Sequence, residues 1–229
     1  MMKKRTAFFA GRLRTLAVCT LSGALAGALA SLSGCNIVGP AYYFIHGPEK
    51  TPAAFTLDKT RSTVVFVDDQ NSVLPRRSLR MEIAAAATEL IQTQKLVDDV
   101  IDSRGAIVAA TRDRESEPMS VVAVGRAVKA QIVVYVAIDA FSLTSGGVAY
   151  APVARVRVKV LDAENDVRLW PPENLPDGAP LNVNMHEKPG TRPSSASQVA
   201  QAENELARET GTAVAELFFE HEARRPNRK

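Results

Sequence analysis

The sequence predicts one α/β domain of the mixed α+β kind, with three layers, a mixed sheet, a long β-hairpin and a C-terminal amphipathic helix. A short apolar run at 63–67 is typical of a strand buried on both faces, and a helical pattern follows it. Two long strand patterns, at 131–143 and 153–161, flank a Gly-rich turn and predict the hairpin. A helical period at 197–222 predicts the final helix.

The first unit of the domain is a strand followed by a helix. Thr63–Val67 consists only of β-branched and aromatic residues, and Asp68 and Asp69 end it. Leu74–Leu96 then repeats apolar residues at helical spacing, with Pro75 in the first turn, where proline is tolerated. The residues expected to face inward are Leu79, Ile83, Ala86 and Leu90.

Shorter elements are expected between this unit and the hairpin. Leu96–Ile101 predicts a second strand, Ile107–Thr111 a helical turn and Pro118–Ala130 a helix. Gly125 within that helix costs about 1 kcal/mol relative to Ala, which predicts close approach to a neighbouring backbone. The residues of this helix expected to face inward are Val121, Val124 and Val128.

The hairpin carries the strongest strand signal in the chain. Gln131–Leu143 is followed by a turn at Ser145–Gly147, and the chain returns as Val153–Leu161. Valines alternate with basic residues in the return strand, as in a half-buried antiparallel strand. The basic face is either solvated or meets an acidic polymer or partner. Its residues are Arg155, Arg157 and Lys159.

The last third of the chain combines an irregular segment with a helix. Residues 171–195 are rich in Pro, Gly, Asn and Ser, and they contain one short strand pattern, Leu181–Met185. Trp170, just before this segment, is interpreted as a packed corner, with a ligand platform as the alternative. The final helix, Ser197–Glu222, is expected to face inward through Val199, Ala202, Leu206, Ala213 and Leu217.

Composition predicts the domain organisation. Residues 1–34 combine a basic start with an uncharged apolar run, as in an export signal; a retained transmembrane helix is the alternative. Residues 35–62 form a linker rich in Pro, Gly and aromatic residues, which docks partly on the domain or lies at the membrane interface. The α/β domain spans 63–222, and 223–229 form a basic tail.

The positive charge of the whole chain belongs to this signal. Residues 1–34 hold five of the 28 Lys and Arg and none of the 25 Asp and Glu, so 23 remain against 25, a formal charge of −2. A chain without a basic stripe is not expected to bind nucleic acid. Cys19 lies in the signal, so Cys35 is the remaining thiol and no internal disulfide is expected.

The sequence Leu-Ser-Gly-Cys at 32–35 resembles the lipobox of bacterial lipoproteins. The resemblance implies cleavage between Gly34 and Cys35, a diacylglycerol (palmitate) group on the Cys35 sulfur and an N-acyl chain on its amine, with no other cofactor. Two or more acyl chains hold a protein firmly to a membrane. Asn36 implies, by the same resemblance, an outer-membrane lipoprotein facing the periplasm. An unmodified buried cysteine at the end of the signal is the alternative.

Asp68 and Asp69 are the candidate ligand-binding residues. They lie where the first strand ends, the place where open α/β sheets bind ligands, so a metal or phosphate role is one interpretation and a loop cap is the other. No glycine-rich phosphate loop follows them. His46, His186 and His221 lack the spacing of a metal site and are interpreted as solvated. We therefore expect no metal.

The order of elements around the hairpin resembles a known family. Ala127–Val136 leads into the hairpin, which closes with Val158–Ala163 and is followed by Arg168–Trp170 and the final helix. This order is similar to the α/β domain shared by the curli-secretion lipoprotein, the N-terminal domain of the Tol-system propeller protein and the lipoprotein activators of peptidoglycan synthases. Two features depart from that family. Glu164–Asp166 occupies the place where the family has a glycine, and the channel-forming strands of the curli-secretion lipoprotein have no counterpart in this chain. The resemblance implies docking to envelope machinery without catalytic residues.

Together, these observations predict a membrane-anchored envelope lipoprotein that acts as a non-catalytic scaffold or regulator of an envelope assembly or secretion complex. We do not expect an enzyme, since no Gly-x-Ser-x-Gly elbow occurs and lipid would block Cys35. The expected partners are the membrane and envelope proteins, including peptidoglycan or polysaccharide machinery, with a homo-oligomer left open. The alternative is a periplasmic binding module for a polysaccharide or small ligand at Asp68 and Asp69.

Overall fold

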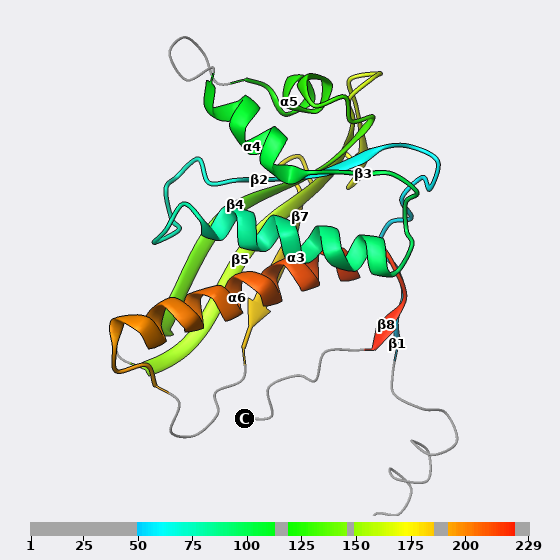
Figure 1. Cartoon of the computed structure of the whole chain (residues 1–229). Coiled ribbons are helices and arrows are strands. Elements are labelled where there is room, and N and C mark those ends of the chain that lie inside the picture. Colours follow the sequence, from blue (N-terminus) through cyan, green and yellow to red (C-terminus); the bar gives the residue numbers. More distant parts are fainter. Residues whose placement is uncertain (1–49, 113–118, 146–148, 186–191, 223–229) are drawn as a thin grey trace, which may run out of the picture. The chain divides into compact units, whose positions relative to one another are not determined.

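The computed structural model of the chain describes residues 50–112, 119–145, 149–185 and 192–222 (Figure 1). The chain divides into two compact units, residues 1–49 and 50–229, and all described residues belong to the second. The predicted signal and Cys35 therefore lie outside the described residues.

A mixed six-stranded sheet forms the centre of this second unit, in the order β3-β2-β4-β5-β6 with β7 also beside β5. β2 runs parallel to β3 and β4, whereas β5 pairs antiparallel with β4, β6 and β7. The fold class predicted from the sequence is confirmed, including the long hairpin. The strands of the sheet are β2 (Thr63–Asp68), β3 (Val100–Ile101), β4 (Ile132–Ser145), β5 (Ala149–Asp162), β6 (Val167–Trp170) and β7 (Ala179–Asn184).

Helices cover both faces of the sheet, which gives three layers (Figure 1). On one face pack α3 (Leu79–Thr93) and α6 (Ala196–Glu216), and on the other α4 (Ser103–Arg112) and α5 (Val121–Ala127). Successive side chains of a strand point to opposite faces. In β2, Val65 and Val67 therefore enter the α3/α6 core, while Val64 and Phe66 enter the α4/α5 core. This double burial explains why the strand is apolar throughout.

The first helix begins at Leu79 rather than at Leu74. The residues before it form a loop, which contains Pro75, so the predicted place of Pro75 in the first helical turn is wrong. Arg76 in the same loop forms hydrogen bonds with residues of α6. Of the predicted inward residues, Leu79 and Ile83 are buried, and Leu90 is partly buried against the same core, while Ala86 is half-buried. Ala84, Ala87 and Ile91 complete the buried side. The acceptors of Arg76 are Glu203 Oε2 at 2.7 Å, Asn204 Oδ1 at 2.9 Å and Ala200 O at 3.0 Å.

The elements before the hairpin also differ from their predicted lengths. The strand expected at 96–101 contains only the two residues of β3, while the helical turn expected at 107–111 belongs to the longer α4. α5 begins after Ser120, whose Oγ accepts the N–H of Ala123 at 3.2 Å, and Pro118 lies outside the described residues. Its buried residues are Val122, Val124 and Gly125, and the predicted Val121 and Val128 are partly buried against the α4/α5 core.

Gly125 marks a close contact, as predicted, but with side chains rather than with a backbone. A Cβ placed on Gly125 would lie 2.5 Å from Val133 Cγ2 and 2.9 Å from Ala163 Cβ. Both distances are below the separation that carbon atoms tolerate, so only glycine lets α5 lie this close to β4 and to the end of β5.

The C-terminal helix ends earlier than predicted because another strand follows it. α6 ends at Glu216, and His221–Glu222 forms β8, which pairs antiparallel with β1 (Lys50–Thr51). Ala202, Leu206 and Ala213 are buried as predicted, but Val199 is 36% exposed. β6 and β8 were not predicted, whereas β7 matches the strand pattern expected at 181–185.

Candidate functional site

Part of one sheet face is not covered by any helix of the described part of the chain. The helices α4 and α5 pack over β2, the first half of β4 and the end of β5, through residues such as Val64, Val133 and Ala163. The side chains of β5 and β7 that point to this same side lie beyond that cover. We call this surface the hairpin face. It consists of Arg155, Arg157, Lys159, Asn182 and Asn184.

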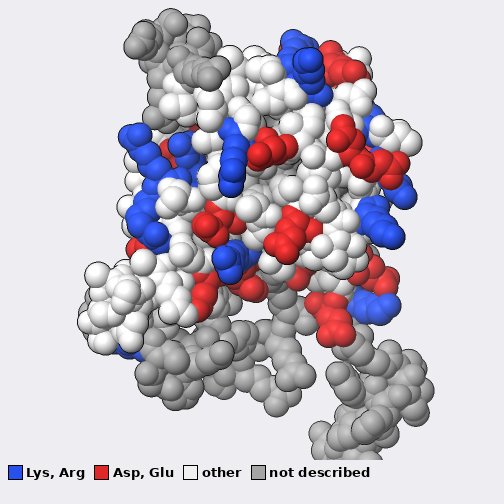
Figure 2. All heavy atoms as spheres, in the orientation of Figure 1, with Lys and Arg blue, Asp and Glu red and all other residues white. Residues whose placement is uncertain are grey.

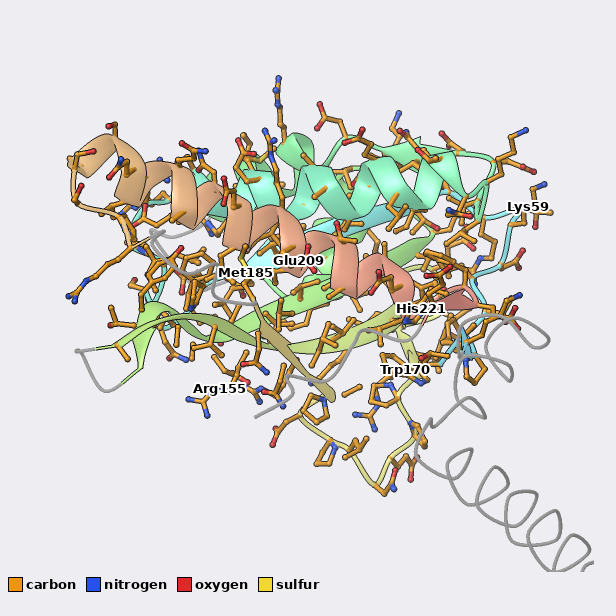
Figure 3. All side chains as sticks on the ribbon, turned by 90° about the horizontal axis from the view of Figure 1, so that it is seen from below. Lys59, Arg155, Trp170, Met185, Glu209 and His221 are labelled. Carbon is orange, nitrogen blue, oxygen red and sulfur yellow. The ribbon has the colours of Figure 1, made fainter. Side chains whose placement is uncertain are left out.

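The predicted alternation of β5 builds this face. Val156, Val158 and Val160 are buried under α3 and α6, so the basic residues between them must point the other way. Figure 3 shows Arg155 directed away from the helices α3 and α6. β7 continues the face, because Asn182 pairs with Arg155 in the register of the two strands.

Arg157 is the neutralised member of the hairpin face. Its Nε donates to Asp139 Oδ2 at 2.8 Å, its Nη2 donates to Asp139 Oδ1 at 2.7 Å, and Asp177 Oδ1 lies 3.8 Å from Nη1. The hydrogen bonds to Asp139 raise the pKa of Arg157. This two-point contact fixes the guanidinium against β4, so the main role of Arg157 is to join the two strands of the hairpin rather than to bind a ligand.

Arg155 and Lys159 flank Arg157 on the same face and form no ion pair with any residue that the structure describes. Arg155 is exposed, Lys159 is half-buried, and the amides of Asn182 and Asn184 are exposed beside them. Two unpaired cations among amide groups can bind carboxylates or other oxygen anions. The face therefore has the chemistry of a polar docking surface.

The charge on the opposite side of the unit is different. Figure 2, drawn in the orientation of Figure 1, shows acidic and basic side chains interspersed, without a broad field of one sign. The hairpin face differs from this side, because its unpaired charged residues, Arg155 and Lys159, are both positive among the described residues.

Asp69 serves as a loop cap in the structure. Its Oδ1 accepts the backbone N–H of Val73 at 2.7 Å, and its Oδ2 accepts that of Leu74 at 3.1 Å. These bonds hold the chain between β2 and α3, which is the structural role that the sequence left open beside ligand binding.

Asp68 faces Tyr135 on the neighbouring parallel strand. The Tyr135 hydroxyl donates to Asp68 Oδ2 at 3.2 Å, and Gln70 Nε2 lies 3.5 Å from the same hydroxyl. Burial, and then the negative charge of Asp68, raise the pKa of Tyr135 well above its usual range. This group of side chains lies at the carboxyl end of β2, beside Ala137 in the register of β4. Sequence reasoning found Asp68 but missed Tyr135, whose position depends on the pairing of distant strands.

The other predicted site residues lie apart from both groups. His46, His186, Gly34 and Cys35 are outside the described residues. His221 was expected to be solvated, but its side chain is 15% exposed because it packs edge-on to Phe219 and lies 3.9 Å from Glu216. Within the described ranges, no three His, Cys, Asp or Glu residues gather as metal ligands.

Trp170 forms a packed corner. Its ring lies 6.4 Å from that of Phe55, and both pack against the α3/α6 core. Next to it lies an apolar surface around β6 that was not predicted, where Val167, Leu169 and Leu175 are each at least 39% exposed. The alternation of apolar residues in 167–170 is the signal that could have found this strand.

Two open hollows flank α3, one of about 550 Å³ toward α6 and one of about 580 Å³ toward α4. The first is lined largely by alanine, threonine and glutamate side chains, the second by a mixture of polar, charged and apolar side chains, and neither contains a predicted site residue. None of the helices in the described part of the chain is long and apolar enough to cross a bilayer.

No family model matches the chain, and no curated protein matches it. Solved structures with a similar fold include the PelC dodecamer from Paraburkholderia phytofirmans, with 13% identity, a TM-score of 0.44, and coverage of 75% of this chain and 97% of that one. The lipoprotein GNA1162 from Neisseria meningitidis has 12% identity and a TM-score of 0.36, covering 64% and 98%. The LpoB C-terminal domain from Salmonella enterica has 12% identity and a TM-score of 0.28, covering 57% and 86%. All three scores lie below 0.5, so the likeness carries no inference about function.

Proposed function

We propose that the chain is a lipid-anchored envelope protein whose α/β domain docks a partner protein in an envelope assembly or secretion complex, without catalysing a reaction. The observation that carries the proposal is the hairpin face, which no described helix covers and whose Arg155 and Lys159 form no ion pair with a described residue. Sheet faces of α/β folds are normally covered on both sides. A face left open beside two covering helices is available to a partner.

The anchor part of the proposal rests on the lipobox pattern that ends at Cys35. Acyl chains on Cys35 would hold the chain at the membrane, and Asn36 favours the outer membrane, with the domain in the periplasm. The compact unit starts at Lys50, so residues 36–49 separate the lipidated residue from the domain. The length of this segment would then limit how far the domain can lie from the membrane surface.

The docking part rests on charge. Arg155 and Lys159 suit a partner surface that carries Asp or Glu side chains, while exposed Asn182 and Asn184 provide amide donors and acceptors. Oppositely charged surfaces accelerate encounter and set the orientation of the complex. Peptidoglycan or polysaccharide machinery, and the kind of assembly served by the family that the hairpin sequence resembles, are the proposed partners.

Site-specific photo-crosslinking in cells tests the docking surface. A photoreactive amino acid at Asn182 or Asn184 on the hairpin face is compared with one at Glu89 or Gln92, which are exposed on α3. We expect a discrete product with an envelope protein from the first pair only. The double change Arg155→Glu and Lys159→Glu should abolish that product, whereas the matched change Arg77→Glu and Arg80→Glu should leave it. Equal yields from both faces, or indifference to Arg155 and Lys159, would refute the surface.

A second candidate function is a binding module for a polysaccharide or small ligand, favoured by the Asp68, Gln70 and Tyr135 group at the carboxyl end of β2. Thermal-shift screening of the purified chain against glycans and metal ions tests it. Stabilisation that disappears in Asp68→Ala but persists in Arg155→Glu would support this function over protein docking.

A further inference from the structure

The strand β7 lies at an edge of the main sheet. It pairs with β5 on one side, and on its other side no described residue pairs with it. The pairing with β5 runs from Ala179 to Asn184 without a bulge, so the free edge is regular. Such an edge presents backbone N–H and C=O groups that can pair with another strand.

The pairing pattern shows which backbone groups of β7 point to this free edge. The N–H of Met185, just after β7, donates to the carbonyl of Pro152 on β5 at 3.1 Å. Successive residues of an edge strand direct their backbone groups alternately toward and away from the partner strand. Asn182 and Asn184 therefore direct theirs outward. Pro180 fits the same phase, because proline occurs in edge strands where its missing N–H would face away from the sheet.

Beyond Pro180, β7 has none of the features that usually protect a sheet edge. Edges are commonly protected by charged side chains, bulges or a covering segment. Between Leu181 and Asn184 the strand contains no charged residue and no bulge, and the side chains of Asn182 and Asn184 are exposed. The outward N–H and C=O groups of both asparagines thus have no partner among the described residues.

The neighbouring cations determine which side chains an added strand can carry. Arg155 is the register partner of Asn182, and both belong to the hairpin face. A strand added to β7 would lie roughly 10 Å from β5, twice the spacing of paired strands, and an Arg and an Asp or Glu side chain together span this distance. Side chains opposite Asn182 and Asn184 would lie on the hairpin face. These two positions therefore suit acidic residues.

The position between these two suits an apolar residue. It would lie opposite Val183, which is buried in the α3/α6 core, with Leu181 and Met185 partly buried on either side of it. Figure 3 shows Met185 on the side of α6 and Arg155 on the other side of the sheet. An apolar side chain at this position would extend the packing of the core.

We propose that β7 binds an extended acidic segment of the partner protein, which joins the sheet as an antiparallel strand with the pattern acidic, apolar, acidic. The inference rests on the proposed function, because it specifies the partner that the hairpin face receives. Antiparallel addition continues the direction in which β4, β5, β6 and β7 already pair. A second copy of the chain fits less well, since β7 carries no acidic residue to meet Arg155 and Lys159.

Fluorescence polarisation with the full chain in mild detergent tests the proposal. The probe is the labelled peptide Ser-Thr-Val-Glu-Val-Glu-Val-Thr-Ser, and two comparison peptides carry Gln or Lys in place of both Glu residues. We expect the acidic peptide to bind about fivefold more tightly than the Gln peptide, and the Lys peptide to bind more weakly than either. High salt should reduce these differences.

N-methylated peptides test whether the probe binds as a strand. In the antiparallel arrangement, the N–H groups of the two Glu residues face β7, and that of the Val between them faces away. Methylation of both Glu nitrogens should abolish binding, whereas methylation of that Val nitrogen should preserve it.

Two substitutions at one position of β7 separate the backbone from the side chain. Asn182→Pro removes the outward N–H but no hydrogen bond to β5, whereas Asn182→Thr loses the same amide side chain and keeps the N–H. We expect Asn182→Pro to weaken peptide binding about tenfold and Asn182→Thr to preserve it. Thermal unfolding checks that both variants are folded; if Asn182→Pro is not, the N-methylated peptides decide the question.

The outcomes distinguish failure of this inference from failure of the proposed function. Equal binding of the three peptides, or binding that survives methylation of both Glu nitrogens, overturns strand addition. A cellular crosslink from Asn184 that persists in Asn182→Pro but is lost in Arg155→Glu with Lys159→Glu also overturns it, while the docking function stands. Peptide binding without any cellular crosslink supports strand addition and refutes the docking function. A dimer in analytical ultracentrifugation that Asn182→Pro abolishes would assign the edge to a second copy and refute the acidic partner.

Discussion

Asp162, at the end of β5, is a buried carboxylate held by several donors. Both Nη atoms of Arg61 donate to it at 2.8 Å, and the side chains of the pair are 6% and 19% exposed. The N–H groups of Glu164 and Asn165 and the side chain of Asn165 complete its hydrogen bonds. The Arg61 bonds, aided by those of Asn165, hold the pKa of Asp162 well below its usual range. Arg61 therefore joins the segment before β2 to the end of the hairpin.

We predict that Asp162→Asn lowers the free energy of unfolding by about 3 kcal/mol at pH 7, because it removes the buried counter-charge of Arg61 and leaves only that of the exposed Glu164, 3.2 Å from Nη2. Folding lowers the pKa of Asp162, so the pair stabilises the fold above about pH 4 and the contribution is lost as the pH falls toward the folded-state value. Denaturation at pH 7 and pH 3 should show a smaller acid effect in the variant.

The exposed pair of Lys59 and Asp98 is the control for this prediction. Its side chains are 59% and 65% exposed, and Asp98→Asn should change the stability by less than about 1 kcal/mol. If Asp162→Asn is no more destabilising than Asp98→Asn, the buried pair does not stabilise the fold.

The basic residues of β5 show which features of the candidate site could be predicted from the sequence. The charges of Arg155, Arg157 and Lys159 and their common face were predicted, because alternation along one strand is local. The pairing of Arg157 with Asp139 was not, since Asp139 is the extra residue of a β-bulge between Ile138 and Ala140. Only the paired strands reveal that one of the three cations is already neutralised.

At the scale of elements, α3 and α6 pack closely because one helix presents a glycine to the other. A Cβ on Gly211 would overlap the carbonyl oxygen of Ile83, and it would lie 2.8 Å from Ala86 Cβ and 3.0 Å from Ala87 N. These are backbone and Cβ atoms, which cannot rotate away. The separation of the two helices is therefore set by the absence of a side chain.

We predict that Gly211→Ala destabilises the domain by about 1–3 kcal/mol, because the steric overlap outweighs the gain in helix propensity. The matched control is Gly105→Ala in α4, where a Cβ would make an ordinary 3.4 Å contact with Val128 Cγ1. That change should stabilise the domain by up to about 1 kcal/mol. Thermal or urea unfolding of both variants gives the comparison. If the Gly211→Ala variant were more stable than the wild type, α3 and α6 could move apart without a loss of stability.

Elements were predicted well where their signal is local and poorly where it is not. The period of two in β5 and the buried run of β2 locate the sheet directly. The start of α3 depends on Arg76 reaching Glu203 and Asn204, which are far away in the sequence. β8 has two residues and exists through backbone pairing with β1, which no side-chain pattern encodes.

At the scale of the whole molecule, the proposed anchor and the fold are separable. Cys35 belongs to residues 1–49, whereas the main sheet, both cores and the paired strands β1 and β8 are built from residues 50–222. Lipidation should therefore determine where the chain resides without affecting how stable the domain is.

We predict that Cys35→Ser abolishes incorporation of a palmitate analogue and releases the chain from the membrane fraction, while the melting temperature of the domain stays unchanged. Metabolic labelling, fractionation and thermal unfolding measure the three effects. Ser33→Ala, a neighbouring change that keeps a small residue before Cys35, is the control. Equal labelling of wild type and Cys35→Ser would show that the lipobox is not used.

The contact between Phe55 and Trp170 gives the molecule a built-in optical reporter. Trp170 is the only tryptophan of the chain, so its emission comes from a single place, where the segment that precedes β2 packs against the core. Lifting that segment would expose the indole to water and shift its emission to the red. Any event that displaces this segment from the core can thus be followed by ultraviolet fluorescence, without any added label.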